Sequence, residues 1–352
     1  MSNITIKDIA KLCGVGVSTV SRALNNHPDI NPETKARIMQ VIRETGFIPN
    51  DSARYLKRSE TNNIALLVKG ISNPFFFGMI RIMEEYIQKK DYTTILRHVG
   101  TDEDEVAVAM SLVIERRLKG IVFLGGAFTH DPKVLAKLGV PYIFSTIGNV
   151  ANLTAKSVKV ANIAVDDTQA ACMAIDYLVS LGHTRIGFIG EGIGIPSVGR
   201  LRYEGYRKAL EKNHLPYDSA LVAEVNEGTE HYTMPNGYKG ASVLLDRCPD
   251  MTAVFCIADV IAMGACRALV DRGKKIPEDV SVVGFDGIES GDYYIPRLTS
   301  VKQPVEEMSE ETIHLLFEMI EEKKAPQNII VPAKLLIRDS TAPRRSGQTT
   351  AS

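Results

Sequence analysis

The sequence predicts an α/β protein in which a small helical head precedes a larger body made of two parallel-sheet lobes. Two patterns lead to this fold class. Residues 5–45 contain three short segments whose apolar residues recur at helical spacing, whereas from Ile64 onward strand-like apolar runs alternate with helical segments. Repeated strand–helix alternation produces parallel sheets with helices on both faces, and two such series predict two lobes. The length of 352 residues fits two or three structural units.

Three short helices are expected in the head. Thr5 and Asp8 form a capping-box-like start for the first helix, and a second helix follows over 17–24. The third begins with Pro32 at its first position. Three short helices with a tight first turn are typical of a helix-turn-helix, whose second helix enters the major groove of DNA and would place Arg22 at base edges.

The charge distribution agrees with this interpretation but does not prove it. Nine basic and six acidic residues over 1–60 give the head a net charge of +3, against −4 for the rest of the chain. A basic head on an acidic body is compatible with DNA at one end of the protein. From the pattern alone, a DNA-reading unit and an ordinary helical hairpin both stay open.

Composition excludes several other classes. Hydrophobic residues make up 45% and charged residues 24% of the chain, as in soluble globular proteins. The longest apolar runs, 64–68 and 120–126, are far shorter than the roughly 20 residues of a membrane helix. No N-terminal stretch has the pattern of a secretory signal, so we expect a cytoplasmic protein with no membrane partner.

No metal, cofactor or catalytic site is expected. The segment GEGIG at 190–194 follows a strand and suggests a dinucleotide fingerprint, but G-x-G-x-x-G requires glycine where the chain has Ile195. The seven histidines have no metal-ligand spacing. The five cysteines form no C-x-x-C motif and are expected to be reduced and structural. They are Cys13, Cys172, Cys248, Cys256 and Cys266. The chain is therefore not expected to be an enzyme.

The head sequence resembles a known family. TIKDIAKLCGVGVSTVSRALN at 5–25, followed by FIPNDSARYLKR at 47–58, is similar to the opening of the lactose/galactose repressor (LacI/GalR) family of bacterial transcription regulators, and the resemblance continues across almost the whole chain. One departure is Gly16, where the family usually has serine, so a slightly weaker helix start is expected. The resemblance implies a DNA-binding domain at 1–49, a hinge helix and linker at 50–61 and a body at 62–340. The composition of the tail at 341–352 predicts that it is disordered.

The same resemblance implies which residues contact DNA. In the family the hinge folds on operator DNA, pairs with its dimer partner and inserts a leucine into the minor groove, and Leu56 matches that position. Judged by its own composition, the segment could equally be a solvated linker, because two helical turns are marginal in water. The implied DNA contacts are Thr5, Val17, Ser18, Thr19, Ser21, Arg22 and Asn25 in the head, and Asn50, Ala53, Arg54, Leu56 and Lys57 in the hinge.

The body implied by the resemblance is the two-lobed, type I fold shared with sugar-binding periplasmic proteins, with three crossovers between lobes. We therefore expect the first lobe at about 62–160 and 291–322, and the second at about 161–290 and 323–340. From the alternation itself we expect strands at 64–68, 93–97, 120–124, 141–145, 163–165, 185–190, about 221–225, 252–256 and 280–285, with helices at 75–90, 103–117, 131–138, 167–181, 198–213, 237–247 and 259–272.

Ligands in such folds bind beyond the carboxyl ends of the strands, where two lobes face one another. The resemblance implies that the effector-binding residues are Asn73, Phe75, Phe76, Thr146, Arg202, Tyr232, Asp259 and Asp286. A guanidinium donor and a carboxylate acceptor suit a polyol. Alternatively, the phenylalanines belong to the core, and the charged residues form surface ion pairs. Ala258 replaces an asparagine usual in the family, so the effector is expected to differ from those of close relatives or to place an apolar group or a water there.

The sequence thus predicts a dimeric regulator, a repressor, that binds a palindromic operator and changes its DNA affinity with a small-molecule effector, most simply a sugar. An alternative within the family is control by a phosphorylated carrier protein. A sugar-binding protein without DNA function leaves the head unexplained.

Overall fold

The computed structural model describes residues 4–24, 27, 29–45, 47, 62–126, 130–148, 160–192, 194, 196–225 and 231–344. The chain divides into two compact units, Met1–Thr61 and Asn62–Ser352. The hinge segment 50–61 lies outside the described residues.

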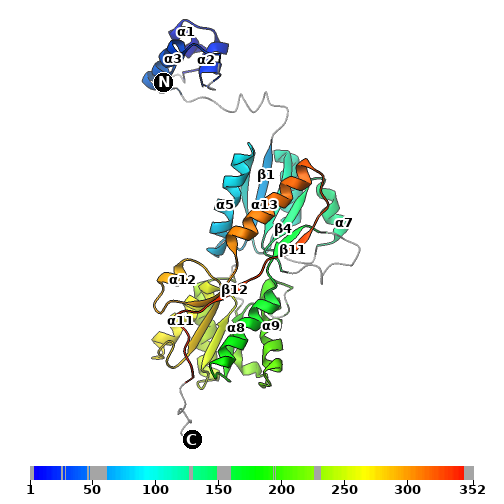
Figure 1. Cartoon of the computed structure of the whole chain (residues 1–352), viewed down its shortest axis with the longest axis vertical. Coiled ribbons are helices and arrows are strands. Elements are labelled where there is room, and N and C mark those ends of the chain that lie inside the picture. The colour runs from blue at the N-terminus through cyan, green and yellow to red at the C-terminus, as the bar shows by residue number, and fades with distance from the viewer. Residues whose placement is uncertain are drawn as a thin grey trace. The chain divides into compact units, whose positions relative to one another are not determined.

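The head contains three helices, α1 (Ile6–Cys13), α2 (Val17–Leu24) and α3 (Pro32–Thr45) (Figure 1). The Asp8 carboxylate accepts hydrogen bonds from the backbone N–H and the hydroxyl of Thr5, at 2.9 and 2.7 Å, and so fixes the start of α1. Gly14, at φ 65°, ends it in the left-handed conformation that glycine adopts at little cost. Ile9, Val20 and Ile38, one from each helix, are fully buried in a common core.

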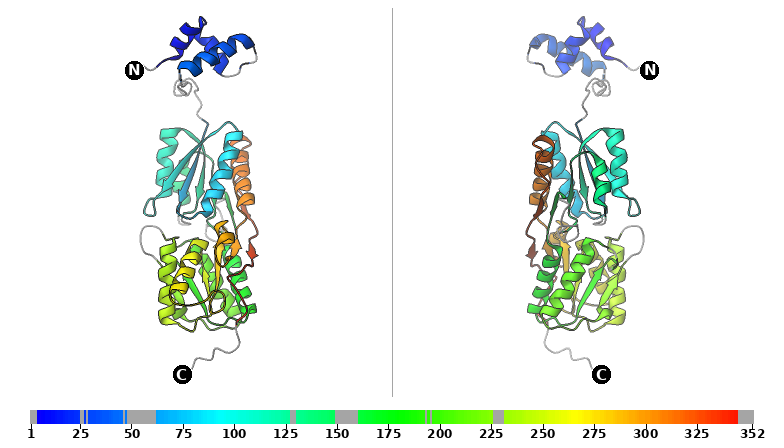
Figure 2. Two further views of the ribbon diagram at one scale, coloured as in Figure 1. Left: turned by 90° about the vertical axis from the view of Figure 1, so that its left-hand side faces the viewer. Right: turned by 90° about the vertical axis from the view of Figure 1, so that its right-hand side faces the viewer.

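The first lobe of the body is built on a six-stranded parallel sheet in the order β11-β5-β4-β3-β1-β2. Its strands are β1 (Asn63–Lys69), β2 (Thr93–Val99), β3 (Leu118–Leu124), β4 (Tyr142–Ser145), β5 (Asn162–Ala164) and β11 (Asn328–Ile330). Its helices are α5 (Phe75–Lys89), α6 (Glu105–Arg116), α7 (Pro132–Leu135) with a 3-10 turn at Ala136–Leu138, and α13 (Val305–Glu321). Helices α13 and α6 cover opposite faces of this sheet (Figure 2).

The two-sided cover explains why β1 is apolar from Ile64 to Val68. Ile64, Leu66 and Val68 pack into the cluster that contains the buried residues of α5 and α13. Ala65 and Leu67, which point the other way, join the cluster of α6. Strands buried on both faces have continuous apolar runs rather than alternation, and this run is what the sequence displays.

The second lobe has a six-stranded sheet in the order β12-β10-β9-β8-β6-β7. All neighbours are parallel except β12, which runs antiparallel to β10. Its strands are β6 (Ile186–Gly190), β7 (Val222–Glu224), β8 (Ala253–Cys256), β9 (Ser281–Asp286), β10 (Thr299–Lys302) and β12 (Lys334–Leu336). Its helices are α8 (Asp167–Ser180), α9 (Val198–Lys212), α10 (Met234–Arg247), α11 (Asp259–Asp271) and α12 (Ser290–Tyr293), with a 3-10 turn at Ser219–Leu221.

The sheet topology corrects the expected lobe boundaries. Strand β5 still belongs to the first sheet and β10 to the second, so the chain leaves the first lobe between β5 and α8 and returns between β10 and α13. It crosses a third time between β11 and β12. The boundaries near 160, 290 and 322 were therefore misplaced. Strand β5 was expected, at 163–165, but was assigned to the second lobe. Strands β10, β11 and β12 are three or four residues long, too short for an alternating pattern to identify them.

Two other expectations are corrected. Helix α10 begins at Met234 rather than at 237, because the Thr233 hydroxyl caps it by accepting the N–H of Asn236 at 3.3 Å. The tail was expected to be disordered from 341, yet the Ala342 N–H donates to Ser281 Oγ at 3.1 Å and the Arg344 N–H to the Leu181 carbonyl at 2.8 Å. These contacts attach the segment up to 344 to the second lobe. Within the described part of the chain, no helix is both long and apolar enough to cross a membrane.

Candidate functional site

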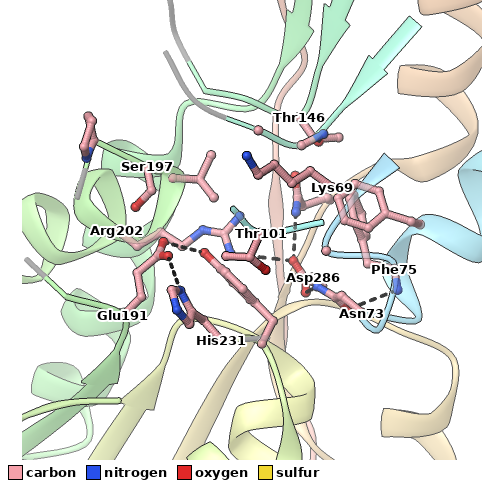
Figure 3. Close-up of a pocket in the computed structure, with 18 residues that line it drawn as sticks. Lys69, Asn73, Phe75, Thr101, Thr146, Glu191, Ser197, Arg202, His231 and Asp286 are labelled. Atoms are coloured by element: carbon pink, nitrogen blue, oxygen red, sulfur yellow. Dashed lines mark hydrogen bonds and ion pairs between the residues drawn. The ribbon is translucent and has the colours of Figure 1, made fainter. Parts of the chain in front are cut away.

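A cavity of about 320 Å³ lies between the two lobes of the body, at the carboxyl ends of their strands. We call it the interlobe cavity (Figure 3). Seven of the eight effector residues implied by the resemblance line it, namely Asn73, Phe75, Phe76, Thr146, Arg202, Tyr232 and Asp286. Its volume is at the lower end of the range usual for small-molecule sites. The structure thus brings these seven residues, distant in sequence, to one place.

The first lobe contributes an apolar edge and short polar groups. Asn73 follows β1, and its Oδ1 accepts the N–H of Phe75 at 3.1 Å, which fixes the first turn of α5. Phe75 and Phe76 pack edge to face with ring centroids 5.4 Å apart, and both are mostly buried. Thr146 follows β4 at φ 69°, and its hydroxyl accepts the N–H of Gly125 at 3.1 Å. The phenylalanines therefore serve both the core and the cavity wall.

Arg202 is the central cation of the second lobe. It is 3% exposed, and its Nε donates to Asp167 Oδ1 at 2.8 Å while Nη1 donates to the Ile257 carbonyl at 2.5 Å. The same Nη1 lies 3.7 Å from Asp286 Oδ1, and the guanidinium stacks 3.6 Å from the ring centre of Phe285. Burial raises the pKa of Asp167 to about 6, although the Arg202 charge opposes this. Arg202 thus neutralises two buried carboxylates rather than a surface partner.

Asp286 links the two lobes. Its carboxylate accepts from Asn73 Nδ2, in the first lobe, and from Gln303 Nε2, each at 2.9 Å (Figure 3). Burial raises its pKa, while Arg202 and the two amide donors oppose the rise. Asp286 has φ 108°, a conformation that costs free energy for a residue with a side chain. Such strain is typical of positions held in place for function.

A second carboxylate, Glu191, faces the cavity directly after β6. It is 7% exposed, and its Oε1 accepts from the Tyr232 hydroxyl at 2.9 Å and from the Gly199 N–H at 3.2 Å. Its Oε2 lies 3.6 Å from Nδ1 of His231. Burial acts to raise the pKa of Glu191, but hydrogen bonds from His231, Ser197 and Tyr232 outweigh it, so the pKa is lowered and the group is anionic.

In the head, α2 has one buried and one exposed face. Val20 and Ala23 are buried in the head core, whereas Val17, Ser18 and Arg22 are exposed. Of the remaining implied contacts in the described part of the head, Thr5 is exposed, and Thr19 and Ser21 are half-buried. Arg22 lies 3.8 Å from Asp29 in an exposed pair, which holds it weakly. The implied contacts Asn25, Asn50, Ala53, Arg54, Leu56 and Lys57 lie outside the described residues.

Comparison with known proteins adds an independent finding. The family model for bacterial regulatory proteins of the lacI family matches residues 5–50, and that for a periplasmic binding protein-like domain matches residues 175–341. The HTH-type transcriptional regulator MalR of Clostridium butyricum is 37% identical over 341 residues, which cover 96% of this chain and 99% of MalR. The chain belongs to the LacI family. It is accordingly a DNA-binding transcriptional regulator and not an enzyme.

Solved structures of LacI-type regulators agree with this fold. The structure titled transcriptional regulator CelR–cellobiose complex has a TM-score of 0.70 at 28% identity and covers 96% of this chain and 99% of its own. A LacI family regulator from Enterococcus faecium with bound ribose has a TM-score of 0.69 at 28% identity and covers 81% of this chain and 100% of its own.

Asp259, the eighth effector residue implied by LacI-family resemblance, does not line the cavity. It is fully buried, its Oδ1 accepts from Ser300 Oγ at 2.6 Å, and its Oδ2 accepts from the Ile288 N–H at 2.8 Å. Burial raises its pKa to about 8. Asp259 therefore joins α11 to the segments on either side of α12 rather than touching an effector. Neighbouring Ala258 is also fully buried and contributes no side chain to the wall.

Several residues of the cavity wall were not predicted from the sequence, among them Lys69, Thr101, Glu191, Ser197, His231 and Gln303. Lys69 ends β1, as Glu191 follows β6, so the rule that ligands bind at strand ends could have identified both. Lys69 Nζ lies 3.0 Å from Glu105 Oε2, and His130 Nε2 lies 2.8 Å from Glu105 Oε1. Asp104, Glu105 and His130 are close enough to share a metal ion, but these contacts already engage both Glu105 oxygens.

Proposed function

We propose that this LacI-family protein is a sequence-specific regulator, acting as a repressor, that binds a palindromic operator as a homodimer. Its DNA affinity would be controlled by a small molecule, a sugar or sugar derivative, in the interlobe cavity. The observation that carries this proposal is the hydrogen bond between Asn73 of the first lobe and Asp286 of the second, inside the cavity. A ligand that replaces this hydrogen bond would contact Asn73 on one lobe and Asp286 on the other, and would so favour one arrangement of the lobes over another.

The chemistry of the wall supports a sugar. Phe75, Phe76 and Tyr232 offer apolar surface to the C–H faces of a sugar ring. Arg202 donates hydrogen bonds, and Asp286 and Glu191 accept them, which matches hydroxyl groups that do both. Two similar regulators have structures with bound sugars, cellobiose in one and ribose in the other.

The exposed face of α2 supports the DNA-reading role. Ser18 and Arg22 are exposed on the helix whose opposite face forms the head core. In a helix-turn-helix the second helix lies in the major groove, and a dimer reads two half-sites related by its own symmetry. We assign the minor-groove contact to Leu56, by its match to the family position.

The test begins with selection of a preferred duplex from a randomised library by the purified full-length chain. Fluorescence anisotropy then measures affinity for that duplex with and without each sugar that raises the melting temperature of the protein. We expect the selected site to be palindromic and at least one sugar to change its affinity. Linkage requires the duplex to change affinity for the sugar by the same factor. A protein that selects a site but responds only to a phosphorylated carrier protein would contradict the effector part of the proposal.

A further inference from the structure

The charges around the interlobe cavity point to a narrower class of ligand. We propose that the cavity accepts an uncharged polyhydroxylated ligand and rejects the phosphate ester of the same compound, and that Glu191 is the residue that enforces this choice. The inference rests on the effector role proposed for the cavity. It concerns which ligands bind there, whatever their effect on DNA binding.

The basic groups of the cavity are already engaged. Among the described residues that line it, the permanent cations are Lys69 and Arg202. Lys69 Nζ lies 3.0 Å from Glu105 Oε2 and donates to the Glu103 carbonyl at 2.9 Å. Arg202 bonds Asp167 at 2.8 Å and lies 3.7 Å from Asp286. A phosphate could accept hydrogen bonds from the remaining N–H groups of either cation, but a buried carboxylate already offsets the charge of each, so neither is free to balance a further anion.

Acidic groups outnumber these cations. Glu191 and Asp286 line the cavity, and Glu105 and Asp167 lie directly behind Lys69 and Arg202. Each of the four is less than one-tenth exposed. At pH 7 a phosphate monoester has roughly two negative charges. It would therefore enter a cavity with two carboxylates in its wall and two more behind it, against two permanent cations and the imidazole of His231, where like charges are poorly screened.

Glu191 differs from the other three carboxylates in its partners. Asp167, Asp286 and Glu105 each have an arginine or lysine within 4 Å. The contacts of Glu191 are the Tyr232 hydroxyl, the Gly199 N–H, Ser197 and His231, whose imidazole is a cation only when it is protonated. Hydroxyl and amide donors stabilise an anion without cancelling its charge. These contacts of Glu191 therefore include no permanent cation, in contrast to those of the other three carboxylates.

An uncharged polyol fits the same wall well. Its hydroxyl groups can donate to Glu191 and Asp286 and can accept from Arg202, Lys69 and the amide of Asn73. In Figure 3 Glu191, Ser197 and Arg202 face the cavity from one side, and Lys69, Phe75 and Thr146 from the other. A ligand that spans the space would thus meet donors and acceptors on both lobes without bringing a charge of its own.

The test compares matched pairs of ligands by isothermal titration calorimetry on the full-length chain. The probes are glucose, ribose and cellobiose, each with a phosphate ester: glucose 6-phosphate, ribose 5-phosphate and cellobiose 6-phosphate. We expect at least one uncharged sugar to bind and its ester to bind about tenfold more weakly or worse, a difference of about 1.4 kcal/mol or more, since the added phosphate repels the nearby carboxylates. An ester that binds as tightly as its parent sugar, or more tightly, would overturn the proposal.

Glu191→Gln tests the assigned residue. Glutamine keeps an acceptor for Tyr232 and Gly199 but removes the charge, so the ester-to-sugar ratio of dissociation constants should fall several-fold, mainly through tighter ester binding. Glu204→Gln is the matched control, because Glu204 lies on α9 in an exposed pair with Arg200, and it should leave the ratio unchanged. An unchanged ratio in a folded Glu191→Gln protein refutes the role of Glu191. The wild-type comparison does not depend on how that variant folds.

Failure of the underlying function gives a different result. If neither sugars nor esters bind while the chain still selects a DNA site, the effector role of the cavity is wrong, and the selectivity inferred from it fails too. Binding of esters alone refutes only the charge argument.

Discussion

Replacement of Arg202 by methionine should destabilise the second lobe strongly. Methionine keeps much of the side-chain volume but removes the guanidinium shared by Asp167 and Asp286, each 2% exposed. Removing one partner of a buried ion pair typically costs about 3–5 kcal/mol, because the remaining charge has neither water nor a partner. We expect a loss of that size in the free energy of unfolding at pH 7.

The loss should be smaller at lower pH. Without Arg202, the pKa values of both carboxyl groups in the folded protein should rise beyond their already raised values. A raised pKa means that the folded state holds the proton more tightly than the unfolded state, so stability is gained as pH falls through the folded pKa and lost as it rises. The variant should therefore recover part of its stability between pH 7 and pH 5.

Urea unfolding followed by far-ultraviolet circular dichroism and tyrosine fluorescence measures this, since the chain has 12 tyrosines and no tryptophan. Arg200→Met is the control, because Arg200 forms an exposed pair with Glu204 on the same helix, and it should cost less than about 1 kcal/mol. Adding Asp167→Asn to Arg202→Met should recover about 1–3 kcal/mol. Equal losses for the two arginine variants, or a loss that does not change with pH, would refute the reasoning.

Three further predictions concern the head, a buried carboxyl group and helix packing. Arg22→Ala should cost about 1–3 kcal/mol of discrimination at one base-pair position without changing the melting of the body; affinities for single-base variants of the selected duplex measure this, and unchanged preference would remove α2 from base reading. Burial raises the pKa of Asp259 to about 8, so the group is protonated in the folded protein at pH 7. Between pH 7 and pH 9 the free energy of unfolding of the wild type should therefore fall by about 1.4 kcal/mol more than that of Asp259→Asn. Urea unfolding of both proteins at the two pH values measures this, and equal losses would show that Asp259 is already ionised at pH 7. Gly264→Ala should destabilise the protein by about 1–3 kcal/mol, although alanine favours a helix more than glycine does. The new Cβ would overlap the Met234 carbonyl oxygen of α10 and lie 2.8 Å from the carbonyl carbon. Thermal melting measures this, with Gly194→Ala as the control because nothing lies within 4 Å of that position; equal melting midpoints for the two variants would show that α10 and α11 move apart at no cost.

The sequence alone determined the local elements and their order. The apolar periodicity of 6–13, the cap at Thr5 and the strand–helix alternation from Ile64 each depend on neighbours two to four residues apart, so they are readable before any tertiary contact forms. Seven of the 18 residues that line the interlobe cavity, Asn73 and Arg202 among them, were predictable by resemblance of short motifs.

Only the tertiary structure decided what these residues touch. Glu191 contacts His231 although α9 and β7 separate them in the chain, and Lys69 contacts Glu105 although α5 and β2 separate them. Asp259 bonds Ser300 and does not line the cavity. The lobe boundaries likewise depended on which sheet accepts the short strands β10, β11 and β12. Contacts of this kind depend on how whole sheets and helices pack, and the free energy of that packing comes from burial summed over many residues. The spacing of residues along the chain therefore does not predict which of them meet.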